Sequence, residues 1–290
     1  MMIEGQSLLT RSIEILRADP SEFGRLVMGK ARRLGKSRSE SIIGHIGKVS
    51  FEFDFGLASP TVSMMWRRTY QPEIVIAMRR YLRTGSTFAD VGANVGYFSA
   101  IGADLVGSSG SVIAFEPVPR YVDHLTRFKS LNADFDISVC PVAVGDVHGT
   151  VQIFVNREDN IGANSLVREA VPNPADPVEV DVVRLADSLD TRVDLIKMDI
   201  EGFEIPALRG LGDRLPAIGR PPILCEFNPQ HYETLGVTLD DAHEWMSSVG
   251  YRSREVLPDR PIDLRGLTAL HDVLLVPTDS AEDGTTSSVL

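Results

Sequence analysis

The sequence predicts an α/β protein with a doubly wound, mostly parallel sheet, an N-terminal helical appendage and a small antiparallel insertion. From Thr87 onward, apolar runs of strand length alternate with stretches of helical periodicity, which is typical of a parallel sheet. A glycine turn follows the first of these runs. The chain has 290 residues, 43% of them hydrophobic, which suffices for one main domain with additions. We expect an appendage over residues 1–50, the main domain over 51–277 and a disordered tail over 278–290.

The appendage has a composition of its own. Between Arg25 and Arg38 the basic residues follow one another without an intervening acid. Apolar positions are sparse, so we expect short helices lying on the main domain. A solvated helix face explains the basic run, and attraction to an anionic membrane surface is the alternative.

The segment after the appendage combines a strand and a helical stretch. Val49, Phe51, Phe53 and Phe55 alternate with polar residues, which predicts a strand. The stretch 60–82 has helical character and precedes the glycine turn, so we expect it to serve as a lid over that turn.

The remaining elements follow in order. The expected strands of the main sheet are Thr87–Val91, Ser111–Glu116, Ile137–Val144, Val193–Asp199, Ile223–Phe227 and His271–Val276. Helices are expected from Val95 and from Pro119. Two alternating runs, Thr150–Val155 and Val178–Val183, flank the polar segment 156–177 and predict the antiparallel insertion.

The glycine turn predicts a ligand site. The run Phe88-Ala-Asp-Val-Gly-Ala-Asn-Val-Gly-Tyr-Phe-Ser99 joins a buried strand to an apolar helix. Gly92 and Gly96 lack a β-carbon, which lets the backbone turn tightly and approach a ligand. Glu116 ends the next strand, where a βαβ unit places an acid facing a ribose. The pattern therefore predicts a bound nucleoside.

The spacing of the glycines indicates which nucleoside cofactor binds. Dinucleotide sites show G-x-G-x-x-G, whereas this turn reads Asp90-x-Gly92-x-Asn94-x-Gly96. S-adenosylmethionine carries a sulfonium and an ammonium and no phosphate, so the Asp90 carboxylate near its methionine end is favourable, directly or through water. Glu116 would accept both ribose hydroxyls. NAD is the alternative, because this acid fits its ribose equally well. The bland alternative is an ordinary strand, turn and helix whose acids merely happen to lie at strand ends.

A second polar group lies at the same edge of the sheet. Asp199 and Glu201 follow an apolar strand, and open α/β sheets bind ligands at that edge. Lys197 interrupts the strand, so its ammonium requires a carboxylate such as Asp199 or Glu226. His231, two residues after Pro229, is either a general base or a solvated loop histidine. A structural ion pair with an acid in a helix's first turn would explain the same residues.

Metal binding and nucleic-acid binding are less favoured. Asp199, Glu201, Glu204, Glu226 and His231 would at best hold a hard divalent ion, and without H-E-x-x-H or cysteine-pair spacing we expect no metal. The formal net charge of −11 disfavours nucleic acid as a partner.

Location is predicted from the cysteines and from the hydropathy of the chain. Cys140 and Cys225 lie in apolar runs and read as free core thiols. Neither a secretion signal nor a membrane span is recognisable, so we expect a cytoplasmic protein. The oligomeric state is not fixed by any feature of the sequence.

Four motifs together resemble the FkbM family of S-adenosylmethionine-dependent methyltransferases, over about 73–277. They are Asp90-Val-Gly-Ala-Asn-Val-Gly-Tyr-Phe-Ser99, Phe115-Glu-Pro117, Ala143-Val-Gly-Asp146 and Ile196-Lys-Met-Asp-Ile-Glu-Gly-Phe-Glu204. The resemblance implies a Rossmann-like class I methyltransferase fold. It also implies O-methylation of a hydroxyl on a sugar, glycolipid or polyketide-type small molecule.

The resemblance also implies roles by position. The cofactor-binding residues would be Asp90, Gly92, Asn94, Gly96 and Glu116, with Val144, Gly145 and Asp146 near the adenine. Asp199 and Glu201 would face the acceptor, beside Lys197. We expect Asp199, or else His231, to accept the proton of the acceptor hydroxyl. An NAD-dependent oxidoreductase and a non-catalytic cofactor-binding module are the alternative functions.

Overall fold

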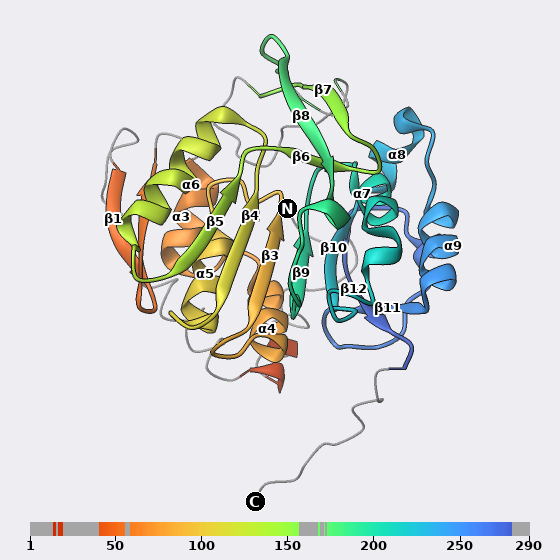
Figure 1. The fold of residues 1–290 in the computed structure, drawn as a ribbon, viewed down its shortest axis with the longest axis horizontal. Coiled ribbons are helices and arrows are strands. Elements are labelled where there is room, and N and C mark those ends of the chain that lie inside the picture. The colour runs from red at the N-terminus through yellow and green to blue at the C-terminus, as the bar shows by residue number, and fades with distance from the viewer. Residues whose placement is uncertain are drawn as a thin grey trace, which may run out of the picture.

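The structure is a computed structural model that describes residues 14–15, 17–19, 41–55, 59–156, 168, 171 and 173–279. Its centre is a seven-stranded sheet in the order β11-β12-β10-β9-β3-β4-β5 (Figure 1). The strands are β3 (Thr87–Val91), β4 (Ser111–Phe115), β5 (Asp136–Cys140), β9 (Leu195–Met198), β10 (Ile223–Phe227), β11 (Tyr251–Glu255) and β12 (His271–Pro277).

The sheet is mostly parallel, as the sequence predicts. Strands β5, β4, β3, β9 and β10 run parallel to one another, and β12 runs antiparallel to both β10 and β11. The chain moves outward from β3 to β4 and β5, then returns to the other side of β3 with β9. Doubly wound sheets bind ligands where the strand order reverses in this way. The predicted fold class is confirmed, and the expected site lies between β3 and β9.

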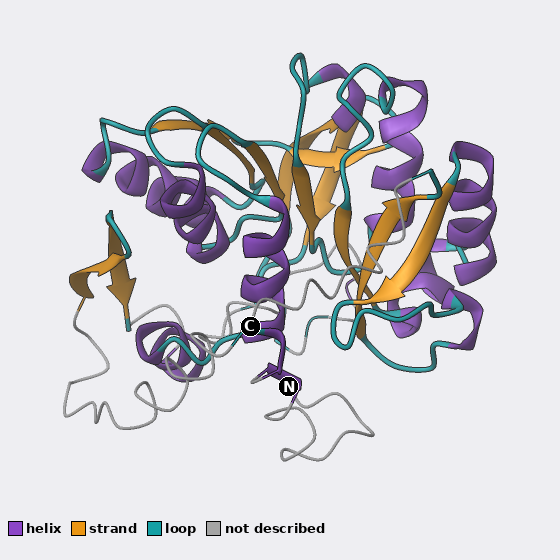
Figure 2. Ribbon diagram, turned by 90° about the horizontal axis from the view of Figure 1, so that it is seen from below, coloured by secondary structure: helices purple, strands orange, loops and turns teal. Residues whose placement is uncertain are grey.

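Helices cover both faces of the sheet (Figure 2). They are α3 (Ser59–Arg67), α4 (Pro72–Tyr81), α5 (Tyr97–Val106), α6 (Pro119–Leu131), α7 (Glu204–Leu211), α8 (Pro229–Leu235) and α9 (Leu239–Val249), with 3₁₀ turns η2 (Leu185–Asp187), η3 (Gly212–Arg214) and η4 (Leu264–Gly266). None of the helices in the described ranges is long and apolar enough to cross a membrane.

The two layers have separate cores because successive strand residues point to opposite faces. Phe88 of β3 and Leu195 of β9 belong to the core shared with α5. Their neighbours Ala89 and Ile196 belong to the core shared with α7. All four side chains are fully buried. The central strands are therefore apolar on both faces, which explains why their sequences read as continuous apolar runs.

The appendage prediction needs a correction. Residues 41–46 form strand β1 (Ser41–Ile46), which pairs with β2 (Val49–Asp54) in an antiparallel hairpin. The predicted boundary at residue 50 therefore cuts through a hairpin. Phe51 and Phe53 alternate into the core, and Phe51 contacts the Phe128 ring at 6.1 Å between centroids. Of the earlier residues, 14–15 and 17–18 are helical, and the basic run 25–38 lies outside the described residues.

The run Ile137–Val144, predicted as one strand, is two strands in two sheets. β5 ends at Cys140, and β6 (Ala143–Gly145) joins a three-stranded sheet in the order β6-β8-β7. Pro141 lies between them and has no N–H for a continuing ladder. The predicted antiparallel pair is confirmed in β7 (Gly149–Ile153) and β8 (Val178–Arg184). Most of the polar segment between them lies outside the described residues, as does the tail from 280 onward.

Strand β11 at the sheet edge is absent from the prediction. Its sequence, Tyr-Arg-Ser-Arg-Glu, carries three charges, and its alternation places Tyr251 and Ser253 in buried positions. An antiparallel edge strand needs one apolar face only, which leaves a weak apolar pattern in the sequence.

Candidate active site

A cavity of about 470 Å³ opens at the carboxyl ends of β3, β4, β9 and β10. The glycine turn and the residues that follow β4 line it, as do Asp199, Glu201, Glu226 and Asp272. Thr69, Tyr70 and Gln71, from the connection between α3 and α4, complete this part of the lining. The predicted turn and the predicted polar group therefore belong to one cavity.

Gly92 brings the backbone of the turn against the end of β9. Its φ is +81°, in the left-handed region, and a β-carbon there would lie 1.9 Å from the backbone oxygen of Asp199. The N–H groups of Gly92 and Ala93 both donate to the carbonyl oxygen of Phe115, at 2.9 Å. Only glycine fits this position, since both the conformation and the close approach exclude a side chain.

Gly96 and Asn94 differ in their relation to the cavity. Asn94 lines it with a left-handed φ of 53°, and its Oδ1 accepts the Val95 N–H at 2.8 Å. Gly96 begins α5 and does not line the cavity; a β-carbon there would lie 2.7 Å from the Leu125 side chain of α6. Gly96 therefore permits helix packing beneath the turn.

Glu116 is held in place by the backbone. Its Oε2 accepts the Asn94 N–H at 2.8 Å and its Oε1 accepts the Val118 N–H at 2.8 Å. Burial raises the pKa of Glu116 to about 7, although these N–H groups favour the carboxylate. Each oxygen keeps a lone pair for a further donor. A buried carboxylate that lines the cavity beside the turn can therefore accept hydroxyl groups.

Asp90 does not line the cavity, although the sequence predicts it beside the cofactor. Its side chain is fully buried in the sheet, and its Oδ2 accepts the Ser99 hydroxyl at 2.6 Å. Burial raises the pKa of Asp90, and the ammonium of Lys197 counteracts this effect.

Lys197 finds the partner that the sequence predicts. Its Nζ donates to Asp199 Oδ2 at 3.1 Å and lies 4.8 Å from the centre of the Phe98 ring. Burial alone would lower the pKa of Lys197, but the carboxylates of Asp199 and Asp90 outweigh it and raise that pKa. Lys197 is therefore a permanent buried cation at the base of the cavity.

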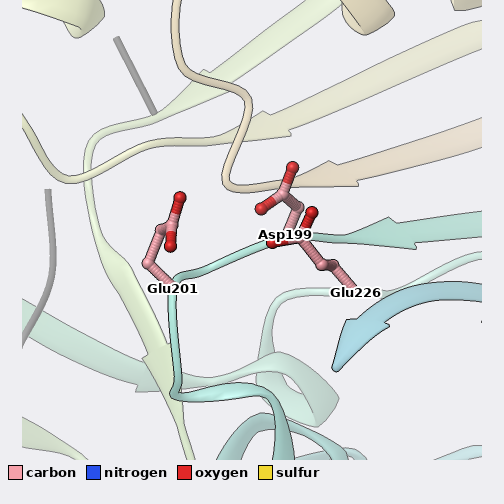
Figure 3. A group of neighbouring side chains, drawn as sticks. All are labelled: Asp199, Glu201 and Glu226. Atoms are coloured by element: carbon pink, nitrogen blue, oxygen red, sulfur yellow. The ribbon is translucent and has the colours of Figure 1, made fainter. Parts of the chain in front are cut away.

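Three carboxylates converge at the strand ends: Asp199, Glu201 and Glu226, with oxygens within 4.8 Å of one another (Figure 3). Burial, together with the negative charge of Asp199, raises the pKa of Glu201 and of Glu226. Such a group can share protons or hold a divalent ion, and among the described residues it is the group whose geometry would allow a metal. The sequence predicts none.

Asp272 adds a fourth carboxylate that the sequence analysis did not identify. It lies opposite Glu226 in the antiparallel register of β10 and β12 and lines the cavity. Opposed residues on such a ladder have side chains on the same face. Only the pairing of β12 with β10 brings this residue to the site, 46 positions after Glu226 in the sequence.

Glu204 and His231 stand behind the cavity. Glu204 Oε1 accepts the N–H groups of Ile200 and Gly202 at 3.0 and 3.1 Å, and its Oε2 accepts the Tyr232 hydroxyl at 3.1 Å. Burial raises the pKa of Glu204 to about 7. His231 does not line the cavity; its Nδ1 lies 3.9 Å from Glu201 Oε2, and burial lowers its pKa. Both residues support the turn that carries Glu201.

Of the three residues predicted near the adenine, one lines the cavity and two do not. Val144 lines the cavity, whereas Gly145 and Asp146 do not. A β-carbon at Gly145 would lie 2.9 Å from the ring of Phe203, which does line it.

The predicted lid is two helices joined by a tight connection. Arg68, directly after α3, and Gln71, directly before α4, both have a left-handed backbone conformation, with φ of 60° and 37°. Tyr70 between them packs on the rings of Tyr97 and Phe98, at 5.8 and 5.9 Å between centroids. Burial and the nearby carboxylates, Asp199 first, raise the pKa of Tyr70, so its hydroxyl remains a donor. The connection thus places a neutral aromatic hydroxyl over the acidic end of the cavity.

The strand order, the glycine turn after β3 and the buried acid after β4 define the class of Rossmann-like α/β proteins. Within that class, the chain belongs to the FkbM methyltransferase family, whose methyltransferase FkbM domain matches residues 90–253.

Solved structures similar to this chain include the methyltransferase FkbM of Methylobacillus flagellatus KT, with 18% identity and a TM-score of 0.42 over 91% of this chain and 60% of that one. Trm5b of Pyrococcus abyssi shares 12% identity, with a TM-score of 0.42 over 83% and 56%. P. horikoshii TYW2 in complex with MeSAdo shares 14%, with a TM-score of 0.42 over 85% and 74%. The chain thus spans 60% of the length of the M. flagellatus protein. No curated protein matches the chain.

Proposed function

We propose that the protein is an S-adenosylmethionine-dependent O-methyltransferase that acts on a hydroxyl of a sugar, glycolipid or polyketide-type small molecule. The observation that carries the proposal is the position of Glu116. Its buried carboxylate lines the cavity and is fixed by the N–H groups of Asn94 and Val118. A carboxylate so placed suits the two hydroxyls of a ribose.

The charge of the cavity favours a cationic nucleoside. Glu116, Asp199, Glu201, Glu226 and Asp272 line it together with the cation Lys197. An excess of carboxylates attracts a sulfonium and an ammonium and repels a pyrophosphate. The left-handed turn at Gly92 lacks the G-x-G-x-x-G pattern of a dinucleotide site. These features support S-adenosylmethionine over the NAD of an oxidoreductase.

On the acceptor side, we assign the base to Asp199. S-adenosylmethionine supplies the electrophilic methyl group on its sulfonium. Asp199 lines the cavity, and its Oδ2 is held by Lys197 Nζ at 3.1 Å, which leaves Oδ1 to accept the proton of the acceptor hydroxyl. Such general-base catalysis contributes about 10²–10⁴-fold. Glu201 lies beside this group, and His231, which contacts Glu201 from outside the cavity, positions it.

The acceptor class follows from charge and from the cover. A net charge of −11 and an acidic cavity suit a neutral or cationic acceptor better than a nucleic acid. Tyr70 offers a ring and a hydroxyl, which suit a sugar. For a glycolipid, the basic run 25–38 would add attraction to an anionic membrane surface. The free thiols Cys140 and Cys225 support a cytoplasmic location.

Ligand-induced stabilisation tests the proposal. S-adenosylmethionine and S-adenosylhomocysteine at 100 times their dissociation constants should each stabilise the protein by about 2.7 kcal/mol in a thermal melt. Glu116→Ala should abolish this, whereas Asp134→Ala, at an exposed acid that does not line the cavity, should not. Stabilisation by NADH alone would overturn the proposal. Cofactor binding without methyl transfer to any glycoside or glycolipid would favour a non-catalytic binding module.

A further inference from the structure

Asp90 is a buried carboxylate that does not line the cavity. It lies in β3, the central strand, with an exposed fraction of 0%. The Ser99 hydroxyl of α5 donates to its Oδ2 at 2.6 Å. Its Oδ1 is buried without a hydrogen-bond partner among the described residues. A buried carboxylate in this state stays ionised only beside a cation, because its charge has lost the stabilisation by water.

Lys197 is that cation. Asp90 and Lys197 are register partners on the parallel strands β3 and β9, so their side chains leave the sheet on the same face. The Phe98 ring of α5 lies 4.8 Å from the Lys197 ammonium on that face. Each charge favours the ionised form of the other.

Lys197 connects this buried charge to the cavity. Its Nζ donates to Asp199 Oδ2 at 3.1 Å, and Asp199 lines the cavity. The ammonium therefore has one carboxylate inside the sheet and one at the cavity surface. Without Asp90, the carboxylates left near the buried ammonium would be those at the cavity, Asp199 and Glu226, and no charge would hold the ammonium inside the sheet.

We propose that Asp90 is a positioning residue that acts through Lys197 to hold Asp199 toward the cavity, and that it makes no contact with the methyl donor. The proposal deepens the proposed function, on which the role of Asp199 rests. It assigns the acid of the glycine-turn motif to the acceptor side of the site.

The first test compares two nucleosides. S-adenosylhomocysteine carries the amino-acid part of the donor, and 5′-methylthioadenosine lacks it. If Asp90→Asn leaves the ratio of their dissociation constants in calorimetry within about threefold of the wild-type ratio, the absence of contact is supported. Loss of affinity of about tenfold or more for S-adenosylhomocysteine alone would show a contact with its ammonium and overturn the proposal. Ser99→Ala, which keeps the charge of Asp90, is the matched control.

The second test needs no ligand. Lys197→Met should lower the Tm by about 6 °C or more, since it leaves buried carboxylates without their cation. Asp90→Asn should lower the Tm of the wild type and raise the Tm of Lys197→Met, because it then removes an uncompensated charge. If Lys197→Met does not fold, recovery of folded Asp90→Asn/Lys197→Met is the same result. Equal, additive losses in both backgrounds would overturn the coupling.

The two tests separate the failure of this inference from failure of the proposed function. A wild-type protein that binds neither nucleoside contradicts the cofactor assignment, and the Tm cycle then still decides whether Asp90 acts on Lys197. Normal binding of both nucleosides together with additive Tm losses contradicts the positioning role alone.

Discussion

Replacing Gly92 with alanine should disable the site and destabilise the fold. The left-handed φ of +81° would cost an alanine about 1–2 kcal/mol. The added β-carbon would lie 1.9 Å from the Asp199 oxygen and 2.9 Å from its carbonyl carbon, and both are backbone atoms that no rotamer change can move. Overpacking of this kind costs about 1–3 kcal/mol, so the total loss should be about 2–5 kcal/mol.

Two other glycines separate these contributions. Gly236 has a φ of +65° and no atom within 4 Å of its added β-carbon, so Gly236→Ala measures the backbone conformation alone. Gly149 has open space and no left-handed φ, so Gly149→Ala should be nearly neutral. Urea unfolding of the three variants gives the free energies, and calorimetry with S-adenosylhomocysteine gives the affinities. A loss in Gly92→Ala no larger than in Gly236→Ala, with unchanged affinity, would refute the reasoning.

Three further predictions concern the carboxylates. Because the pKa of Glu116 is about 7 in the folded protein and about 4.5 in the unfolded chain, its stabilising contribution is complete below pH 4.5 and is lost as the pH rises through 7, by about 3 kcal/mol. Glu116→Gln should remove that part of the decline in urea unfolding across pH 4.5–7; an unchanged pH profile would contradict the assignment. Asp199→Asn should reduce turnover of a glycoside acceptor by about 10²–10⁴-fold in a labelled-methyl assay, with unchanged S-adenosylhomocysteine affinity; full turnover would exclude the base. Tyr232→Phe removes the hydroxyl bonded to Glu204 and should cost about 1–3 kcal/mol in urea unfolding, whereas no loss would show that this contact is not stabilising.

Local sequence determined much of the fold. The strands over Thr87–Val91 and Ile223–Phe227 were predicted with the bounds that the structure has, because each is a short apolar run between turn residues. Where the observed strands differ from the predicted ones, a local feature of the sequence competes with the apolar pattern. Pro141 divides the run Ile137–Val144 between two sheets, and the charged edge strand β11 has too few apolar residues to be recognised.

The sequence likewise predicted some residues of the candidate site and missed another. The glycine turn and Glu116 were predicted from spacing, because a βαβ unit fixes both by local geometry, and Lys197 with Asp199 was predicted because two residues along one strand end are neighbours. Spacing could not reveal Asp272, which comes to the cavity only through the pairing of β12 with β10.

The sequence by itself thus determined the class of the fold, the turn that lines the cavity and the residue types at the strand ends, since these depend on steric and apolar patterns within a few residues. Tertiary structure decided which of those side chains face the cavity. Asp90 is sealed inside the sheet and His231 stands behind Glu201, whereas Tyr70 reaches the cavity from the α3–α4 connection. Exposure to a cavity depends on the elements packed around a residue, and these come from distant parts of the chain.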